Sequence, residues 1–251
     1  MKTPLIIGHR GAPDRAVENT ESSFRAALDA GASIIETDVR LTADGEIVIS
    51  HDADFSRLGG PSEPIIRSSR EDIEKIILRD DAGRTEKPLF LDRALKIFPD
   101  VQFSIDLKDP GPAIVRAWTD LMRRSGSEKR CRTASFRDRT LRIFRRLNPG
   151  APVSVARFRV LQLLMRTIFG GVSAPGEGEG VLQLPERAGI LGILTPERIS
   201  RWQKAGWRVQ VWTVDNEEDM KRLVSWGIDG IITNKPHLLK EVLEIRDSQE
   251  N

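Results

Sequence analysis

Three acidic residues occur where their side chains could bind one cation together. Glu36 and Asp38 lie two residues apart in the apolar run SIIETDV, so in a β-strand both side chains point to the same face. Asp106 has a similar place in a later run, QFSIDL. Mg²⁺ and Ca²⁺ prefer carboxylate oxygens, and the three acids are therefore a candidate site for a divalent cation. The plainer alternative is that they only form ion pairs with Arg10 and Lys108.

Two of the three histidines also follow apolar runs. His9 comes directly after LIIG, and His51 comes after EIVIS. Imidazole exchanges protons near neutral pH, so two histidines beside a carboxylate cluster could serve as general acid and general base. A pair of zinc ligands is the weaker alternative, because the cluster is rich in oxygen. The third histidine, His237, falls in a late helical segment, where a surface position is expected.

Two cations and two further residues complete the candidate site. The forked guanidinium of Arg10 and the ammonium of Lys108 suit a phosphate group beside a metal, although each could simply balance a nearby acid. Glu18 could orient Arg10 or His9, or it could only favour the start of a helix. Trp212 could wall the pocket against an apolar part of a substrate or fill the interior of the fold.

Residues so far apart in the sequence can meet only if a sheet brings their strand ends together. Eight short apolar runs alternate with helical patterns, which is typical of a parallel sheet. The runs are LIIG, SIIETDV, QFSIDL, RTASF, PVSVA, VLQL, RVQVWTV and DGIIT. This order predicts an α/β fold of the TIM (β/α)8 barrel type, whose active sites lie at the carboxyl ends of the strands. The candidate acids, histidines and cations fall at such ends.

Two kinds of local pattern place the connections. Helical patterns cover residues 21–31, 70–78, 88–99, 195–206 and 216–227. Between Val39 and His51 there is no room for a helix, and Asp44-Gly45 predicts a tight hairpin. We therefore expect the second strand to extend past the barrel rim and return antiparallel, which would bring His51 beside Asp38.

Composition excludes several classes of protein. The 251 residues suit one domain over residues 1–251, and the net charge of +2 does not indicate a nucleic-acid partner. Nine arginines between Arg123 and Arg146 are spaced as on a solvated helix face. The single cysteine, Cys131, excludes an internal disulfide. Because we find no signal-peptide core and no apolar window long enough to cross a bilayer, we expect a soluble, cytoplasmic protein.

The region after Ala156 is the hardest to interpret. FRVLQLLMRTIFGG is an apolar segment with arginines, and the glycine-rich SAPGEGEG follows it. A barrel helix and a flexible loop are the preferred interpretation, and a helix in peripheral contact with a membrane is the alternative. The sequence gives no indication of the oligomeric state.

Seven motifs in a fixed order extend these chemical observations. They are HRG at residues 9–11, ENT at 18–20, ETDV with a following TADG, ISHD at 49–52, IDLK at 105–108, VWTVDN and GIDGIITNKP. From residue 7 to about residue 236 the chain resembles the glycerophosphodiester phosphodiesterase family. The resemblance implies a TIM barrel with a small insertion at about residues 53–85. It also implies hydrolysis of glycerophosphodiesters to glycerol 3-phosphate and an alcohol, with a divalent cation, Mg²⁺ or Ca²⁺.

The resemblance also implies a role for each residue of the site. By motif position, His9 and His51 are the general acid and the general base, without an indication of which is which. The metal ligands are Glu36, Asp38 and Asp106. The phosphate ligands are Arg10 and Lys108. It suggests that the neighbouring glycerol hydroxyl attacks phosphorus. Three positions depart from the family pattern: Val17, Asp106 and Asn234. Asp106 stands where glutamate is usual, which leaves the choice between Mg²⁺ and Ca²⁺ open.

Two other functions remain as alternatives. A lysophospholipase D type of phosphodiesterase would have to accommodate an acyl chain, and the apolar run over residues 158–169 supports it. A non-catalytic barrel that binds phosphorylated metabolites or membrane surfaces is the second. Both histidines and all three acids argue against that barrel, because binding requires no proton transfer.

Overall fold

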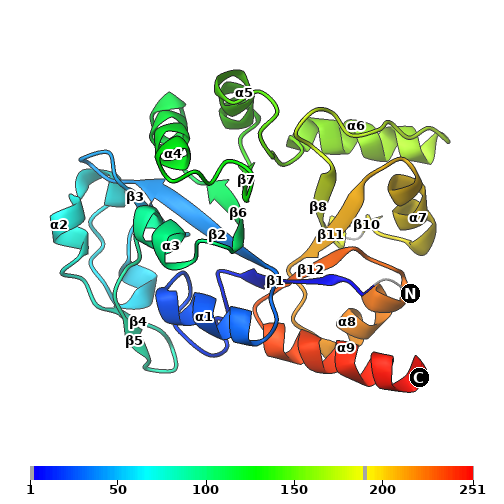
Figure 1. The fold of residues 1–251 in the computed structure, drawn as a ribbon, viewed down its shortest axis with the longest axis horizontal. Coiled ribbons are helices and arrows are strands. Elements are labelled where there is room, and N and C mark those ends of the chain that lie inside the picture. The colour runs from blue at the N-terminus through cyan, green and yellow to red at the C-terminus, as the bar shows by residue number, and fades with distance from the viewer. Residues whose placement is uncertain (1–2, 189–190, 251) are drawn as a thin grey trace.

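The centre of the molecule is a curved parallel sheet surrounded by helices (Figure 1). The computed structural model describes residues 3–188 and 191–250, and within them the sheet has seven parallel strands. In spatial order these are β7 (Cys131–Ala134), β6 (Gln102–Leu107), β2 (Ile34–Leu41), β1 (Leu5–His9), β12 (Gly230–Thr233), β11 (Arg208–Trp212) and β8 (Val181–Pro185). The register pairs His9 with Glu36 and Asp38 with Asp106, so these side chains lie level at the carboxyl ends.

The eighth predicted strand is reduced to a bridge. Val153 makes an isolated parallel bridge to Thr133, and its backbone N–H donates to the carbonyl of Gly178 at 2.9 Å. Pro152 has no backbone N–H to donate to a ladder. The α/β barrel predicted from the sequence is confirmed, but a short extended segment takes the place of one strand.

The second strand continues into a hairpin. β3 (Ile47–Ile49) pairs antiparallel with β2, with Val39 opposite Ile49 and Leu41 opposite Ile47. Gly45 in the turn has φ +84°, a left-handed conformation that favours glycine. The backbone N–H of Ser50 then donates to the carbonyl of Asp38 at 2.9 Å, which brings the chain back to the rim.

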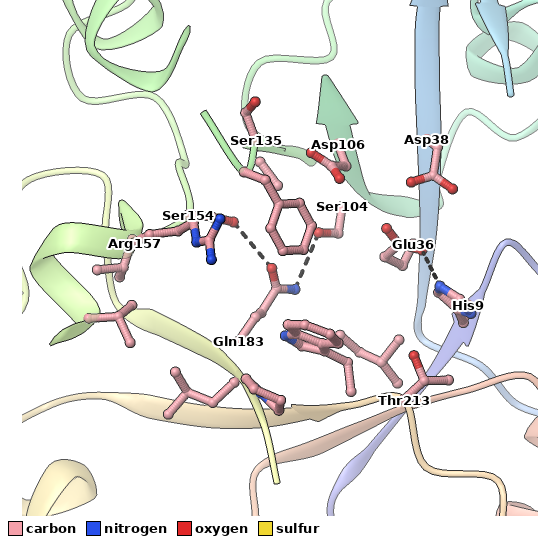
Figure 2. Close-up of a pocket in the computed structure, with 18 of the residues that line it drawn as sticks. His9, Glu36, Asp38, Ser104, Asp106, Ser135, Ser154, Arg157, Gln183 and Thr213 are labelled. Atoms are coloured by element: carbon pink, nitrogen blue, oxygen red, sulfur yellow. Dashed lines mark hydrogen bonds and ion pairs between the residues drawn. The ribbon is translucent and has the colours of Figure 1, made fainter. Parts of the chain in front are cut away.

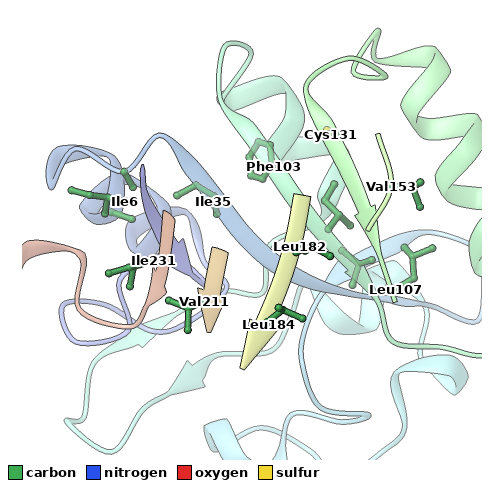
Figure 3. Close-up of a cluster of buried hydrophobic side chains, with 14 of the residues drawn as sticks. Ile6, Ile35, Phe103, Leu107, Cys131, Val153, Leu182, Leu184, Val211 and Ile231 are labelled. Atoms are coloured by element: carbon green, nitrogen blue, oxygen red, sulfur yellow. The ribbon is translucent and has the colours of Figure 1, made fainter. Parts of the chain in front are cut away.

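Side chains alternate along the strands between an apolar outer face and a polar interior. Outward residues such as Ile35, Phe103 and Leu182 belong to the main hydrophobic core (Figure 3). Phe103 packs against Phe24 of a covering helix, with ring centroids 6.0 Å apart. The covering helices are α1 (Glu21–Asp29), α3 (Leu91–Ile97), α4 (Pro112–Arg124), α5 (Asp138–Leu147), α6 (Arg157–Ile168), α7 (Pro196–Lys204), α8 (Glu217–Ser225) and α9 (Pro236–Glu250). No helix in the described part of the chain is long and apolar enough to span a membrane.

A segment after β3 has a small core of its own. Its short elements are two 3-10 turns (Ser56–Leu58 and Ile65–Arg67), α2 (Arg70–Ile73), β4 (Leu78–Arg79) and β5 (Thr85–Glu86). The core consists of Val17, Val48, Phe55, Ile65, Ile73, Leu78 and Phe90. The helix predicted over residues 70–78 is wrong in length: it ends at Ile73, because Leu78 instead pairs with Glu86 in a short hairpin.

The glycine-rich segment over residues 173–180 is held by specific contacts. The Glu179 carboxylate is almost fully buried between Arg145, at 2.7 Å, and Arg159, at 2.9 Å. The indole N–H of Trp207 donates to the carbonyl of Ser173 at 2.7 Å. A second short hairpin follows, formed by β9 (Arg187–Ala188) and β10 (Leu191–Gly192). The segment thus contacts α5, α6 and Trp207, the residue before β11, although its composition predicted a flexible loop.

Candidate active site

The residues predicted for the site meet in one pocket at the carboxyl ends of the strands (Figure 2). The pocket has a volume of about 480 Å³. Eight of the predicted residues line it: His9, Arg10, Glu36, Asp38, His51, Asp106, Lys108 and Trp212. Glu18 does not line the pocket but contacts Arg10. His237 lies on α9 and is not part of the lining.

Lys108 lies between two of the three acids. Its Nζ is 2.7 Å from Asp38 Oδ1 and 2.7 Å from Asp106 Oδ2. Burial favours the neutral amine, but the two carboxylates outweigh burial and raise the pKa of Lys108. The ammonium therefore balances part of the negative charge of these acids.

The three acids still repel one another. Burial, together with the charges of Asp38 and Asp106, raises the pKa of Glu36 well above its ordinary value. Burial also raises the pKa of Asp106, against the attraction of Lys108. For Asp38, burial is outweighed by Lys108 and Arg10, which lower its pKa. An additional cation at this point would relieve the repulsion.

Three buried carboxylate oxygens accept no hydrogen bond from the described residues: Glu36 Oε2, Asp38 Oδ2 and Asp106 Oδ1. Asp38 Oδ2 still has the Arg10 guanidinium 3.1 Å away, but none of the three oxygens has the hydrogen bond that a buried carboxylate needs. Carboxylate oxygens are the ligands that Mg²⁺ and Ca²⁺ prefer. Within residues 3–188 and 191–250, there is no group of three or more His, Cys, Asp or Glu side chains close enough together to hold a metal ion as they stand. The donor set thus fits a hard divalent cation in its chemistry, while Lys108 stands between two of the donors.

The loop after β1 holds Arg10 against the acids. Arg10 Nε lies 3.1 Å from Asp38 Oδ2, and Nη1 donates to Glu18 Oε1 at 3.0 Å. The backbone of Arg10 is left-handed, with φ +55°. A Cβ on Gly11 would lie 2.3 Å from the hydroxyl oxygen of Ser23, so only glycine fits after this arginine. This contact explains the glycine of the HRG motif.

His9 is oriented from the neighbouring strand ends. Its Nδ1 lies 2.7 Å from Asn234 Oδ1, and the Asn234 amide group donates to Asp215 Oδ2 at 2.6 Å. Because the amide oxygen can only accept, Nδ1 carries the proton and Nε2 is the other ring nitrogen, 3.8 Å from Glu36 Oε2. Burial and then the charge of Arg10 lower the pKa of His9. The neutral imidazole is therefore favoured.

His51 is held by a chain of charged groups. Its Nδ1 lies 2.8 Å from Asp52 Oδ1, and Arg57 Nε lies 2.5 Å from Asp52 Oδ2. The same guanidinium donates to Glu18 Oε1 at 2.6 Å. Burial would raise the pKa of Glu18, but the hydrogen bond from Arg57 and the charge of Arg10 lower it. One arginine therefore connects the supports of His51 and Arg10.

The side of the pocket opposite the acids is largely apolar. The rings of Phe136 and Trp212 meet edge to face, with centroids 5.8 Å apart. Lys108 Nζ lies 5.4 Å from the centroid of the Phe136 ring, so this ring borders the charged half. Leu161 and Leu164 of α6 extend the same wall. The pocket is thus charged on one side and apolar on the other.

Several residues that shape the site were not predicted. Gln183 donates to Ser104 Oγ at 3.2 Å and accepts from Ser154 Oγ at 3.2 Å, forming a polar floor (Figure 2). A signal existed for two of them, since Ser104 precedes Asp106 by two residues and Gln183 interrupts an apolar strand. Arg57 has no such local signal; Asn234 directly follows β12, and Asp215 and Asn234 lie in the motifs VWTVDN and GIDGIITNKP, but no motif shows what Arg57 and Asn234 contact. Their contacts to Glu18 and His9 join residues 39 and 225 positions apart.

Comparison with known proteins identifies the family of the chain. The model of the glycerophosphoryl diester phosphodiesterase family matches residues 9–238. The chain is 30% identical over 247 residues to the Probable glycerophosphodiester phosphodiesterase 2 of Mycobacterium tuberculosis, covering 96% of this chain and 91% of that protein.

Two solved structures share the fold. A glycerophosphodiester phosphodiesterase from Agrobacterium tumefaciens superposes with a TM-score of 0.75 at 23% identity, covering 95% of this chain and 100% of that one. An Oleispira antarctica phosphodiesterase in complex with the product sn-glycerol-3-phosphate gives 0.74 at 19% identity, covering 96% and 97%. With a family model that spans nearly the whole sequence and a relative aligned along most of its length, the chain belongs to the glycerophosphoryl diester phosphodiesterase family.

Proposed function

We propose that this pocket hydrolyses glycerophosphodiesters to glycerol 3-phosphate and an alcohol, with Glu36, Asp38 and Asp106 as ligands of a divalent cation. One observation carries the proposal: three buried carboxylate oxygens without hydrogen-bond partners share a pocket with His9 and His51. When bound, Mg²⁺ or Ca²⁺ would act as a Lewis acid on the phosphate oxygens.

The chain's own cations would bind and orient the phosphate. Arg10 and Lys108 both line the pocket, and both contact Asp38. A guanidinium fork and an ammonium provide hydrogen bonds to negatively charged phosphate oxygens. Glu18 supports this role by holding one Nη of Arg10 at 3.0 Å.

The two histidines would move the protons. In each ring Nδ1 has a partner within 2.8 Å, so Nε2 is the nitrogen left for the substrate. One imidazole takes the proton of the glycerol hydroxyl as its oxygen bonds to phosphorus. The other gives a proton to the alcohol oxygen as its bond to phosphorus breaks. These two bond changes give a cyclic phosphate of glycerol and the free alcohol. Water then hydrolyses the cyclic phosphate to glycerol 3-phosphate.

Substitution of each histidine tests the proposal. We expect His9→Ala and His51→Ala each to lower kcat on glycerophosphocholine by about 10²- to 10⁴-fold, as loss of a general acid or base does. His237→Ala is the matched control, because this histidine lies outside the pocket lining. A substrate with a nitrophenol leaving group should restore only the variant that has lost the acid. Folded His9 and His51 variants with wild-type turnover would refute the mechanism.

A lysophospholipase D activity of the same pocket is the second candidate. The apolar wall of Phe136, Leu161 and Leu164 favours it, since an acyl chain could lie there while the phosphate meets the acids. Turnover of lysophosphatidylcholine is to be compared with that of glycerophosphocholine. A higher kcat/KM for the lysolipid would support this candidate, and no turnover of the lysolipid would exclude it.

A further inference from the structure

Helix α6 exposes apolar side chains on the side that faces solvent. Its Leu163 and Thr167 are buried, and the hydroxyl of Thr167 accepts from the indole of Trp202 on α7 at 2.9 Å. Four exposed residues lie on another face of α6 and a fifth, Phe169, follows its last residue; each residue is 46 to 81% accessible: Phe158, Leu161, Met165, Ile168 and Phe169. We refer to these five residues as the α6 apolar face.

The spacing of these residues makes the face continuous. Intervals of three, four, three and one residues keep them within one side of a helix. Half of the ten large apolar side chains exposed in the described residues are gathered here. Scattered exposed apolar residues are normal, but a contiguous group marks a surface for interaction.

Arginines border this face. Arg142 and Arg146 of α5 share a surface hollow with Phe158 and Arg159 of α6. Arg159 is paired with Glu179, whereas Arg142 and Arg146 are exposed and form no ion pair with the described residues. Figure 1 shows α5 and α6 next to each other along one edge of the molecule. The apolar face therefore has a positively charged margin.

The face also continues into the catalytic pocket. Leu161 belongs to the α6 apolar face and lines the pocket, and Arg157 of the same helix lines it too. Phe136, which is 53% exposed, lies between this helix and Trp212 at the pocket wall. Whatever covers the α6 apolar face therefore lies beside the pocket opening.

We propose that the α6 apolar face docks on an anionic phospholipid bilayer, with the arginines at the headgroups and the pocket opening toward the lipid. A helix with exposed aromatic and aliphatic residues beside arginines suits such a surface, because apolar burial and attraction to anionic lipids add together. A second copy of the chain fits less well, because a two-fold contact would bring Arg142 and Arg146 of both copies together. This inference rests on the proposed function, which gives the chemistry of the pocket. It adds that the pocket opens at the surface of a bilayer.

Vesicle co-sedimentation tests the docking separately from catalysis. Wild-type protein is mixed with vesicles of phosphatidylcholine alone or of phosphatidylcholine with phosphatidylglycerol, at low and high salt. The variant Ile168→Ser/Phe169→Ser removes apolar area outside the pocket lining. Its matched control is Ile66→Ser/Ile77→Ser, since both of these side chains are 52% exposed. They flank α2, which lies across the molecule from α6 (Figure 1).

We expect wild-type protein and the control to bind the anionic vesicles, and the Ile168/Phe169 variant to bind them about tenfold more weakly or worse. Arg142→Glu/Arg146→Glu should lose the preference for anionic vesicles. Absence of wild-type binding, or equal binding by the Ile168/Phe169 variant and the control, would overturn the proposal. The proposal would also be overturned if the wild type and the control were dimers in solution and the Ile168→Ser/Phe169→Ser variant were a monomer. Turnover of soluble glycerophosphocholine by each protein is measured in parallel. If wild-type protein turns over this substrate but does not bind vesicles, only the docking proposal fails. If it binds vesicles but does not turn over the substrate, only the proposed function fails.

Discussion

Glu36 bears the largest electrostatic cost among the acids of the pocket. Its side chain is 14% exposed, and burial and the charges of Asp38 and Asp106 raise its pKa well above the ordinary value of 4.5. The folded protein therefore holds a proton on Glu36 more tightly than the unfolded chain does. Its contribution to the free energy of unfolding is favourable at low pH and is lost as the pH rises through the raised pKa.

Replacing Glu36 with glutamine should separate stability from function. In EDTA at neutral pH, we expect Glu36→Gln to melt at a higher temperature than the wild type, because the amide neither takes up a proton nor buries a charge on folding. The difference should fade as the pH falls below 4.5, where the Glu36 carboxyl becomes protonated in the unfolded chain as well as in the folded protein. Mg²⁺ or Ca²⁺ should raise the Tm of the wild type and leave that of the variant nearly unchanged.

The control for this prediction is Glu63→Gln, on an exposed part of the segment after β3. It should change neither the Tm in EDTA nor the response to the cations. Turnover should fall in Glu36→Gln and remain in Glu63→Gln. A metal-induced Tm shift of equal size in the wild type and Glu36→Gln would remove Glu36 from the proposed ligand set.

At the level of elements, the strands of the N-terminal half were the most predictable. Alternation along SIIETDV and QFSIDL gives the inward direction of Glu36 and Asp106, and the barrel rule places both at one rim. The sequence pattern around Val153 predicted a strand and could not show that this segment makes only an isolated bridge. Its pairing depends on Gly178, 25 residues later, and a local pattern contains no information on that contact.

Gly178 gives a test of how this region closes. Its φ is +71°, and a Cβ there would lie 2.3 Å from the carbonyl oxygen of Ala151. Gly83 has a similar φ of +78° with no atom within 4 Å of the added Cβ, and it is the matched control. We expect Gly83→Ala to lower the free energy of unfolding by about 1–2 kcal/mol, from backbone strain alone. Gly178→Ala should cost about 1–3 kcal/mol more, from the clash.

Urea unfolding of both glycine variants checks this expectation. Equal losses would mean that the segment over residues 173–180 moves away from Ala151 without cost. In that case the barrel would not depend on the backbone bond between Val153 and Gly178. A larger loss at Gly178 would show that this segment is part of the closed barrel.

At the scale of the whole molecule, the described residues form two separate hydrophobic cores. The barrel has the main core, and the segment after β3 has the smaller one around Phe55 and Ile73. Polar contacts join the segment to the loop after β1: Arg84 donates to the carbonyls of Pro13, at 2.7 Å, and Asp14, at 2.9 Å. The segment is therefore fixed to the loop that carries the HRG motif.

Long-range contacts of this kind explain why the site was predicted only in part. The residues on strand ends follow from periodicity and topology. Arg57 does not, because it lies in a segment with no regular pattern and gains its role only when that segment folds against the rim. Its guanidinium contacts both Asp52, which holds His51, and Glu18, which holds Arg10.

We expect Arg57→Ala to lower kcat on glycerophosphocholine by about 10- to 100-fold, as loss of a group that orients functional side chains typically does. KM should rise as well, because Glu18 would no longer fix Arg10 for the phosphate. Arg57→Lys should not restore activity, since an ammonium lacks the fork that reaches Asp52 and Glu18 together. Arg67→Ala, an exposed arginine of the same segment, is the control and should keep wild-type kinetics. If Arg57→Ala kept them too, the segment would support the barrel without orienting His51 or Arg10.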